Sequence, residues 1–588
     1  MMQQQRSSLS QSVLASLYAA PALLSARRPM AAAMISTTVH RSITTMPNLR
    51  LFAIAMINRQ RTALSVPAVL PHASWPSSPV HHHQQHPPPL QQQFTYNQLL
   101  CDAAVLKTML LHEHASSAVT DLHGRRVAFL MPRGYTYVSC LYAIWSAGGI
   151  AVPLCTSHPS TELEYTIQDS GADTVMYDPQ YTEQINPIQA RLPGIRWISS
   201  NEFPTKPAMN TMMLDLVDFD TSRGALLIYT SGTTGKPKGV LFTHAGLEAQ
   251  VSALVSAWEW TFEDRILHVL PLHHIHGIVN VLLCALWAGA TCELTADHKF
   301  NPREIWKRWM EPQQNLTLFM AVPTIFAKLA AEFETMDADD QRRARIACSQ
   351  FRVMVSGSSA LSQSGFTKWL EITGHRLLER YGMTEVGMAL GNPLNGPRVS
   401  GEVGCPFPGV QVKIVSQDTG VDVAPMSNEP GELLIRGPQV FSEYWGRPDA
   451  TRDAFAEPGH WFQTGDVACQ TPLGMFKILG RASVDILKSG GYKISALDIE
   501  REMGDHDKIA EVAVVGIPDV DWGERIGAVV VLKNKSITMT IDELRSWLAP
   551  RLAPYKLPTR LVVLEEIPKN AMGKINKKEL SNLFCNAK

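Results

Sequence analysis

Short apolar runs alternate with helix-like segments along most of the chain from Phe94 onward. Alternation of this kind is typical of parallel sheets covered by helices. A chain of 588 residues also exceeds what one hydrophobic core organises, so we expect at least two folded units. The runs are "RVAFLM" (126–131), "TVMY" (174–177), "ALLIYT" (225–230), "ILHVL" (266–270), "FRVMVSG" (351–357) and "EVAVVG" (511–516).

The pattern changes after about Arg436. The segments "WFQTGDVA" (461–468) and "FKILGRASVDILKSGGYKI" (476–494) predict short strands joined by turns. We therefore expect an α/β fold with a large N-terminal domain over residues 94–480, which contains parallel-sheet αβα layers and a β-rich subdomain. A small, mobile α+β domain is expected over residues 481–588.

The N-terminal region differs in composition from the rest of the chain. No Asp or Glu precedes Asp102, whereas arginines are spread among Ser, Ala, Leu and Met, as in an organellar transit peptide. We predict a transit-peptide-like presequence over residues 1–80, a low-complexity linker over 81–93 and a mitochondrial matrix location, with a cytosolic form if translation starts at a later Met. The longest apolar run, "LFAIAMI" (51–57), is far shorter than the roughly 20 residues that cross a bilayer, so no transmembrane helix is expected.

Overall composition excludes several classes of function. The formal net charge is -1, so the whole chain has no electrostatic reason to bind nucleic acid. The nine cysteines include no C-x-x-C pair, which argues against a zinc site and a disulfide framework. Small molecules are therefore the expected partners, and composition does not predict an oligomeric state.

The segment "YTSGTTGKPKG" (229–239) has the composition of a phosphate-binding loop. Glycines let backbone N–H groups converge on anionic oxygens, and hydroxyls and lysines add donors and charge. A Walker A loop would need Ser or Thr after the lysine and then a helix, but Lys236 is followed by Pro237 and the chain returns to an extended run. We predict a phosphate-binding turn between two strands, with Thr230, Ser231, Gly232, Thr233, Thr234, Gly235, Lys236 and Lys238 as its binding residues.

This loop resembles the signature loop of the adenylate-forming (ANL) enzymes, a superfamily that includes the acyl-CoA synthetases. The resemblance extends in order over roughly residues 94–588, and within the superfamily the motifs are most similar to malonyl-CoA synthetases of the mitochondrial and plant type. The further motifs are "PLHHIHG" (271–277), "SGSSAL" (356–361), "ERYGMTE" (379–385), "WFQTGD" (461–466), "GRASVDILKSGGYKI" (480–494) and "PKNAMGKINK" (568–577).

The resemblance implies an ATP-dependent acid–CoA ligase. Such an enzyme converts a carboxylate and ATP into an acyl-adenylate and diphosphate, and the CoA thiol then displaces AMP. ATP and CoA would be co-substrates and Mg²⁺ the cofactor, with Glu385 as the metal ligand. Lys574, Thr384 and Glu385 are the implied catalytic residues.

The same resemblance assigns binding roles to the remaining motifs. Gly357 and Tyr381 would border the adenine, and Asp466 with Arg481 would bind the ribose. Lys488, Gly490 and Gly491 would line the path of the CoA pantetheine arm. The C-terminal domain is expected to rotate between the two steps about a hinge within Ser483–Asp485.

The acid is predicted to be malonate. A malonate dianion leaves a second carboxylate in the pocket, and burial of that charge requires a paired cation. We predict Arg398 for this role, with His276 and His274 nearby. Two alternatives stay open: a ligase for another short-chain, medium-chain or aromatic acid, and a catalytically weak protein that binds AMP or CoA.

Overall fold

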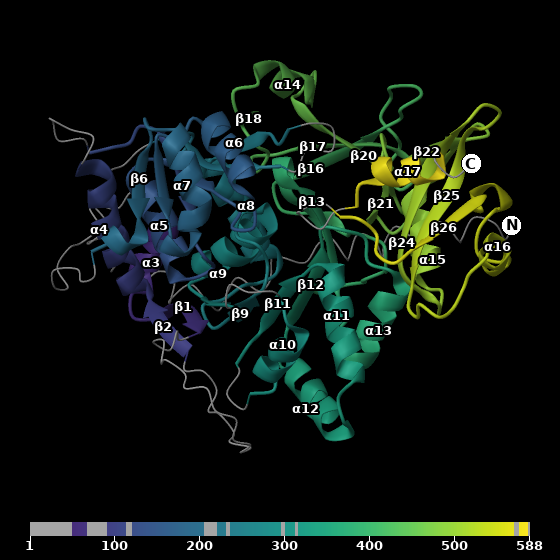
Figure 1. Cartoon of the computed structure of the whole chain (residues 1–588), viewed down its shortest axis with the longest axis horizontal. Helices are drawn as coiled ribbons and strands as arrows, with labels where there is room; N and C mark the ends of the chain where they lie inside the picture. The colour runs from purple at the N-terminus through teal and green to yellow at the C-terminus, as the bar shows by residue number, and fades with distance from the viewer. Residues whose placement is uncertain are drawn as a thin grey trace, which may run out of the picture.

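The computed structural model describes residues 50–67, 91–112, 120–204, 220–230, 236–295, 300–311, 315–569 and 575–585. A large body carries two sheets with helices packed against them, and a smaller unit from the C-terminal part of the chain lies at one end of it (Figure 1). The mixed α/β architecture and the small C-terminal unit agree with the predicted fold class.

A seven-stranded sheet forms one half of the body. Its strand order is β18-β8-β7-β4-β3-β5-β6, and the pairs from β7 through β4, β3, β5 and β6 are parallel. Strands such as β3 and β5 are buried over most of their length because helices cover both faces, which explains their continuous apolar sequence. The strands are β3 (Arg126–Leu130), β4 (Ile150–Pro153), β5 (Thr174–Tyr177), β6 (Arg196–Ser199), β7 (Gly224–Tyr229), β8 (Gly239–Thr243) and β18 (Glu443–Tyr444).

A nine-stranded sheet forms the other half. Its order is β15-β14-β13-β12-β11-β9-β10-β1-β2, with parallel pairs from β13 through to β1 and antiparallel strands at both edges. The strands are β1 (Thr62–Pro67), β2 (Gln91–Thr95), β9 (Arg265–His268), β10 (Thr291–Leu294), β11 (Leu318–Ala321), β12 (Val353–Gly357), β13 (Leu378–Met383), β14 (Gly387–Gly391) and β15 (Cys405–Pro406).

The N-terminal edge of this sheet corrects the predicted domain boundary. Residues 50–67 were expected in the presequence and residues 91–93 in the linker, but α3 (Arg50–Ile57), β1 and β2 belong to the folded body. Phe52, Ala55 and Leu64 are fully buried. An acid-free apolar run suits a buried helix as well as a transit peptide, and local composition does not reveal that β1 pairs with the distant β10.

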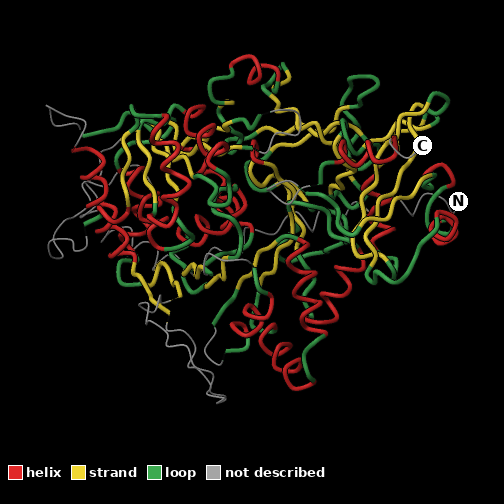
Figure 2. Tube along the Cα trace, in the orientation of Figure 1, coloured by secondary structure: helices red, strands yellow, loops and turns green. Residues whose placement is uncertain are grey.

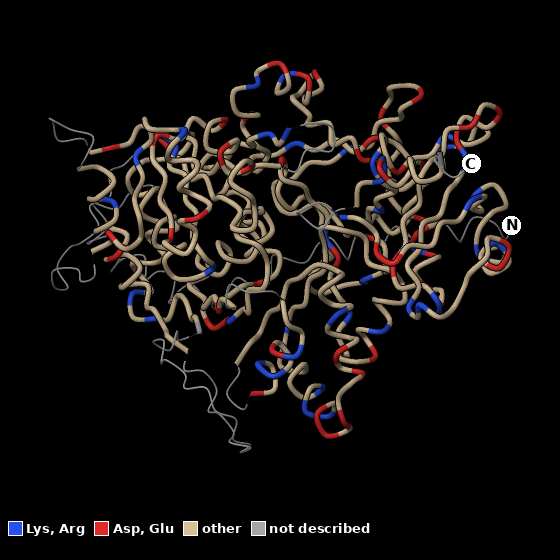
Figure 3. The backbone as a smooth tube through the Cα atoms, viewed as in Figure 1, with Lys and Arg blue, Asp and Glu red and all other residues tan. Residues whose placement is uncertain are grey.

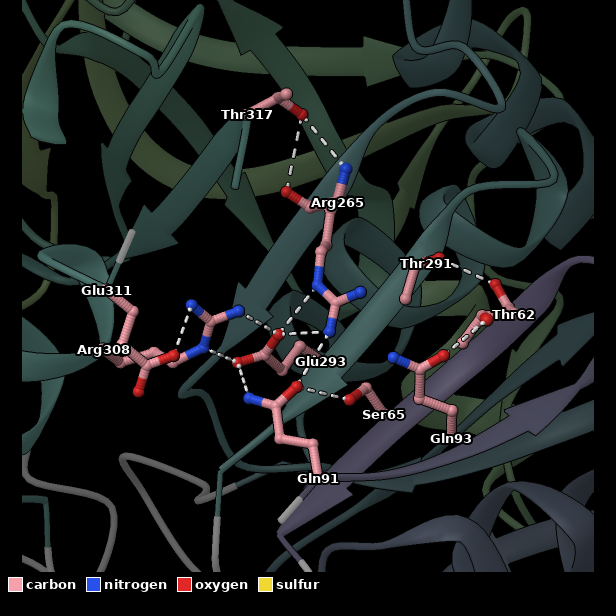
Figure 4. Close-up of polar contacts among 10 residues, drawn as sticks. All are labelled: Thr62, Ser65, Gln91, Gln93, Arg265, Thr291, Glu293, Arg308, Glu311 and Thr317. Atoms are coloured by element: carbon pink, nitrogen blue, oxygen red, sulfur yellow. Dashed lines mark hydrogen bonds and ion pairs between the residues drawn. The ribbon is translucent and has the colours of Figure 1, made fainter. Parts of the chain in front are cut away.

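A buried network of ion pairs and hydrogen bonds connects β1 and β2 to β10 of the body (Figure 4). Glu293 on β10 is 3% exposed and is held by the guanidinium groups of Arg265 and Arg308. The Gln91 side chain on β2 donates to Glu293 at 3.0 Å and accepts from Ser65 of β1 at 2.9 Å. The strands β1, β2 and β10 therefore each contribute one side chain to this network: Ser65, Gln91 and Glu293.

Helices surround the two sheets, as the ribbons and the tube trace show (Figures 1 and 2). Their ends carry ordinary caps: Ser362 caps α13 through the N–H of Gly365, and Gly374 ends it in the left-handed region with φ of 77°. The helices of the body are α3, α4 (Tyr96–His112), α5 (Tyr135–Ser146), α6 (Ser160–Ser170), α7 (Thr182–Arg191), α8 (His244–Ala257), α9 (Cys284–Trp287), α10 (Pro302–Trp309), α11 (Pro323–Glu334), α12 (Ala338–Cys348), α13 (Gln363–Thr373) and α14 (Pro448–Asp453), with short helical turns η1 (Pro179–Tyr181), η2 (Ser200–Glu202) and η4 (Thr384–Val386) and a π-helix, η3 (His276–Leu283).

Two smaller sheets follow in the sequence. The first is the expected β-rich subdomain, with β16 (Gln411–Val415), β17 (Gly431–Arg436), β19 (Phe455–Ala456), β20 (Trp461–Gln470) and β21 (Phe476–Arg481). The second belongs to the C-terminal unit, which has its own hydrophobic core beginning at Leu487. That unit contains β22 (Ile486–Ser489), β23 (Tyr492–Ser495), β24 (Ile509–Asp519), β25 (Gly523–Leu532), β26 (Arg560–Leu564), α15 (Ala496–Gly504), α16 (Ile541–Leu548), η5 (Pro554–Lys556) and α17 (Lys577–Cys585).

Charged residues of both signs are interspersed over the described elements (Figure 3). Among these elements, none of the helices combines the length and the apolar composition that crossing a membrane requires.

Candidate nucleotide and acid site

The predicted phosphate loop connects two paired strands. β7 and β8 are antiparallel, with Tyr229 opposite Gly239, and the N–H of Thr230 donates to the carbonyl of Lys238 at 3.0 Å. The chain after the lysines is therefore a strand, as expected, and not the helix of a Walker A site. Residues 231–235, which include Ser231, Gly232, Thr233, Thr234 and Gly235, lie outside the described residues.

Side chains of α6 hold both ends of this loop. Tyr165 donates to the carbonyl oxygen of Pro237 at 2.7 Å, and Asp169 accepts from the Tyr229 hydroxyl at 2.9 Å. Arg447 pairs with the same Asp169 at 2.7 Å. These contacts fix the ends of the loop against α6, so the backbone that carries Lys236 and Lys238 is held in place.

Each loop lysine lies over a tyrosine ring, and one of these tyrosines also contacts Glu385. Lys238 Nζ lies 4.8 Å from the centre of the Tyr444 ring, and the Tyr444 hydroxyl donates to Glu385 Oε1 at 2.9 Å. Lys236 Nζ lies 5.3 Å from the ring centre of Tyr165. The structure therefore brings the phosphate loop next to the short turn η4, which carries Glu385 and its neighbour Thr384.

Glu385 has the chemistry that a hard cation requires. Its carboxylate is 7% exposed, and the described residues engage Oε2 in no hydrogen bond. The described residues contain no cluster of three or more His, Cys, Asp or Glu side chains suited to a metal. A single carboxylate fits Mg²⁺, which commonly takes one or two protein carboxylates and completes its shell with substrate phosphates and water.

The predicted ribose residues form one connected group. Asp466 on β20 lies opposite Arg481 on β21, and Arg481 Nε donates to Asp466 Oδ1 at 2.9 Å. The Tyr381 hydroxyl donates to Oδ2 at 2.5 Å. Burial, followed by the charge of Asp466, raises the pKa of Tyr381 well above its ordinary value, so the phenol stays protonated and remains a donor.

Gly357 lies at the end of β12 and has a steric reason to be glycine. A Cβ at this position would lie 2.6 Å from Nε of Arg380 on the adjacent strand β13. The next residue, Ser358, has φ of 73°, so the chain turns sharply away from the strand. Gly357 therefore lets the Arg380 side chain pass against the backbone at the predicted adenine border.

Arg380 is a buried cation without an acidic partner. It is 4% exposed, and NH2 donates to the Ser358 hydroxyl at 2.9 Å. Its Nε has no hydrogen-bond partner, and no carboxylate of the described residues forms an ion pair with it. Burial lowers the pKa of Arg380 to about 9, which leaves the group charged at neutral pH.

His276 shares the Ser358 hydroxyl with Arg380. Its Nδ1 lies 3.2 Å from that oxygen, whereas Nε2 has no hydrogen-bond partner among the described residues. Burial first and the nearby charge of Arg380 second lower the pKa of His276 well below its usual value, so it is neutral at pH 7. The His274 ring centre lies 4.1 Å from that of His273, with the two rings tilted at 54°, just before the π-helix begins at His276.

Arg398 occupies a different environment. Its guanidinium donates to the backbone carbonyls of Arg376 and Leu394, each at 2.6 Å. No hydrogen bond or ion pair of the described residues joins Arg398 to His276. His276 instead shares the Ser358 hydroxyl with Arg380.

Sequence reasoning missed Arg380 although it stands inside the quoted motif "ERYGMTE". The available signal is that Arg380 closely follows the apolar pair Leu377 and Leu378, where a charged side chain that becomes buried needs a partner or a function.

The predicted CoA residues lie on a tight hairpin. Ser489 on β22 pairs with Tyr492 on β23, which leaves Gly490 and Gly491 as a two-residue turn with φ of 56° and 83°. Two positive φ angles in such a turn favour glycine at both positions. Lys488 is exposed on the same hairpin. Among the described residues, no hydrogen bond or ion pair joins Lys488 to the nucleotide residues. Lys574 lies outside the described residues.

Comparisons with known proteins agree over most of the chain. A model of the AMP-binding enzyme family matches residues 76–445, and one of the AMP-binding enzyme C-terminal domain matches residues 498–574. The mitochondrial malonate–CoA ligase ACSF3 of Xenopus laevis is 46% identical, over 83% of this chain and 87% of that protein. The malonate–CoA ligase of Arabidopsis thaliana is 38% identical, over 84% and 85% respectively. The crystal structure of ATP-bound MatB from Rhodopseudomonas palustris has a TM-score of 0.77 at 28% identity and covers 92% of this chain and 99% of its own.

Proposed function

Because the chain belongs to the AMP-binding enzyme family, we propose that it is an ATP-dependent acid–CoA ligase that acts on malonate. Malonate and ATP form malonyl-adenylate and diphosphate, and CoA then converts the adenylate into malonyl-CoA and AMP. The similarity to malonate–CoA ligases from an amphibian and a plant supports this acid.

The buried guanidinium of Arg380 is the observation that carries the choice of acid. A dicarboxylate activated at one end leaves a second carboxylate in the pocket, which is costly to bury unless a cation faces it. Arginine can bind a carboxylate through two parallel hydrogen bonds. Arg380 has an unpartnered Nε, and His276 next to it has an unpartnered Nε2, so both can receive this group. An apolar or aromatic acid would leave the cation unpaired.

Adenylate formation brings an anionic carboxylate against an anionic nucleotide, and preorganised positive groups offset the repulsion. Lys236 and Lys238 bind the β- and γ-phosphates at the loop, and Thr384 orients the α-phosphate. Mg²⁺ held by Glu385 would neutralise charge on the phosphate oxygens. Tyr381, Asp466 and Arg481 hold the adenosine, which fixes the α-phosphate for in-line attack.

Lys574 is proposed to bridge the acid carboxylate and the α-phosphate during this step. In the second step the CoA thiol attacks the carbonyl carbon of the adenylate and AMP leaves. Lys488 and the turn at Gly490 and Gly491 are proposed to line the pantetheine path, because a turn without side chains allows close approach.

The direct test measures diphosphate release with and without CoA, using malonate, methylmalonate, succinate, acetate, octanoate and a cinnamate. The protein should start upstream of Arg50 so that α3 and β1 are retained. We expect CoA-dependent turnover to be highest with malonate. Preference for a monocarboxylate would keep the ligase reaction and reject the acid, whereas absence of diphosphate release with every acid would favour a protein that only binds AMP or CoA.

Two arginine variants identify the acid selector. Arg380→Met should lower kcat/KM for malonate by about 100-fold or more, since a charge that loses its buried partner costs roughly 3–5 kcal/mol. Arg398→Met should change it by less than about threefold, because the guanidinium of Arg398 donates to the backbone carbonyls of Arg376 and Leu394. A larger loss of kcat/KM for malonate in Arg398→Met than in Arg380→Met would instead identify Arg398 as the residue that binds the second carboxylate. Acetate turnover by both variants serves as the control, because acetate has no second carboxylate.

The mitochondrial matrix is the proposed location. The acid-free, arginine-containing residues 1–49 support it, as does the mitochondrial label of the amphibian relative. Fractionation followed by N-terminal sequencing tests this proposal, and a cytosolic protein with an intact N-terminus would contradict it.

A further inference from the structure

Lys577, the first residue of α17, is enclosed by two carboxylates. Its Nζ lies 2.5 Å from Oδ1 of Asp485 and 2.7 Å from Oε1 of Glu500, and its side chain is 11% exposed. Burial alone would lower the pKa of Lys577, but the charges of Glu500 and Asp485 outweigh it and raise the pKa. The ammonium group is therefore charged, and it is the cation that these two acids share.

Asp485 closes the turn between β21 and β22. Its Oδ2 accepts from the N–H of Arg481 at 3.0 Å, and its own N–H donates to the carbonyl of Arg481 at 2.7 Å. Gly480 makes room for this arrangement, since a Cβ there would lie 2.5 Å from Cβ of Asp485. In this structure these contacts fix the orientation of the Asp485 carboxylate within the turn.

The contacts continue from this turn into the nucleotide site. Arg481, held through its backbone by Asp485, donates through Nε to Asp466, whose other oxygen accepts from Tyr381. Lys577, Asp485, Arg481, Asp466 and Tyr381 therefore form an unbroken chain of polar contacts from the last helix of the C-terminal unit to the adenosine residues of the body.

We propose that Lys577 is a positioning residue for adenylate formation, which acts by fixing Asp485 against Arg481 and so holding the C-terminal unit in the orientation of this structure. The inference rests on the proposed ligase function. If the unit turns about Ser483–Asp485 between the two steps, Lys577 and Asp485 move together and the contacts with Arg481 break. Loss of Lys577 should then impair the first step and spare the second.

The test separates the two half-reactions in the full-length protein. Adenylate formation is followed by malonate-dependent exchange of diphosphate into ATP without CoA, and thioester formation by the reaction of chemically prepared malonyl-adenylate with CoA. Lys577→Met should reduce exchange about tenfold, a typical size for coupling between sites, and change thioester formation by less than about threefold. Lys577→Arg should restore most of the exchange.

Two matched variants serve as controls. Glu500→Gln removes the second acid beside the same ammonium group and leaves the pair with Asp485, so the ratio of the two half-reaction rates should stay at the wild-type value. Lys578→Met changes the exposed neighbouring lysine and should leave both rates unchanged. Asp485→Asn should shift the ratio in the same direction as Lys577→Met.

Equal loss of both half-reactions in Lys577→Met, with a lowered Tm, would overturn the proposal, because a purely structural role affects both steps. An unchanged ratio in a stable Lys577→Met protein would overturn it as well. Failure of the proposed function is distinguishable, since the wild-type protein itself would then show no exchange with malonate.

Discussion

Glu385 is the proposed ligand of Mg²⁺ in the nucleotide site. Glu385→Gln keeps the size of the side chain and the contact with Tyr444 but removes the negative charge that the proposed Mg²⁺ ion would bind. We expect adenylate formation to fall about 100-fold or more and to require more Mg²⁺, since a bound cation supplies several kcal/mol of charge stabilisation. Diphosphate release measured across a series of Mg²⁺ concentrations checks this.

Tyr444→Phe is the matched control for Glu385. It removes only the hydroxyl that donates to Oε1, and groups that orient a metal ligand typically contribute about 10- to 100-fold to metal affinity. The variant should therefore lie between the wild type and Glu385→Gln in its Mg²⁺ requirement. An identical Mg²⁺ dependence for all three proteins would exclude Glu385 as the ligand.

Cys155 differs chemically from the other cysteines that the structure describes. Burial alone would raise the pKa of its thiol, but hydrogen bonds with His158 and Ser157 outweigh burial and lower it. Burial raises the pKa of the seven other described thiols: Cys101, Cys140, Cys284, Cys292, Cys348, Cys405 and Cys469.

A thiol with a lowered pKa is a thiolate over more of the neutral pH range, and the thiolate is the form that reacts with alkylating agents. Iodoacetamide at pH 7 should therefore label Cys155 before the five other buried thiols, Cys140, Cys284, Cys292, Cys348 and Cys469, as read by peptide mass spectrometry. His158→Asn should move the labelling profile to higher pH. Uniform labelling, or a profile that His158→Asn does not change, would contradict the prediction.

At the scale of elements, α3 and β1 decide where the folded chain begins. A protein that starts at Met46 retains both, whereas one that starts at Phe94 lacks them together with Gln91. We expect the shorter protein to lose several kcal/mol of unfolding free energy, because removal of a single buried Leu or Phe side chain already costs about 2–5 kcal/mol. Urea denaturation of both proteins measures the difference, and equal midpoints would show that the two elements are dispensable.

The ion pairs of Glu293 with Arg265 and Arg308 should make the unfolding free energy of the protein depend on pH. Burial alone would raise the pKa of Glu293, but Arg308 and Arg265 outweigh it and lower the pKa. A carboxyl of this kind stabilises the fold above its unfolded pKa of about 4.3 and loses that contribution as the pH falls through its folded value. Breaking such a buried pair costs about 3–5 kcal/mol.

Glu293→Gln should therefore lower the unfolding free energy at pH 7, and the gap from the wild type should narrow below about pH 4. Urea titrations at several pH values measure this gap. Glu311→Gln, which changes the more exposed acid beside Arg308, is the comparison and should have a small effect. A gap for Glu293→Gln that stays constant with pH would contradict the assigned charge state.

At the scale of the whole molecule, the two signs of charge nearly cancel, with a sequence isoelectric point of about 7.0. Residues 1–49 contain four arginines and no acid, so their removal would leave a more acidic protein. We predict that protein isolated from mitochondria focuses below pH 7 and begins before Arg50. An N-terminus after Pro67 in a stable, active protein would contradict this boundary.

The local pattern of apolar residues was sufficient to predict many of the central strands of the fold. The six apolar runs named from the sequence all contain strands, from β3 at Arg126–Leu130 to β24 at Ile509–Asp519. Five of these strands lie in the two sheets of the body, where buried parallel strands are almost continuously apolar. The N-terminal strands were missed since their stability comes from distant partners, β10 and Glu293, which no window of neighbouring residues contains.

In the candidate site, too, the residues that lie in sequence motifs could be predicted, whereas those whose role depends on distant contacts could not. Tyr381, Asp466, Arg481 and Glu385 lie in motifs, and the structure brings Tyr381 and Asp466 together across 85 residues of sequence. The environment of Arg380 could not be anticipated, since it depends on which side chains fail to reach a buried group. Arg398 was chosen as a charged residue in a polar loop, and there backbone carbonyls take up its donors.

The pairing of β1 with β10 also sets an order of events for a newly made chain. The Thr291 side chain hydrogen-bonds the backbone of Thr62 across 229 residues, so the first strand must wait for a partner that is synthesised much later. A ribosome adds about 5–20 residues per second, which leaves this edge open for about ten seconds or longer. During that interval an apolar N-terminal segment stays available to chaperones, and a translocation pore can still thread it.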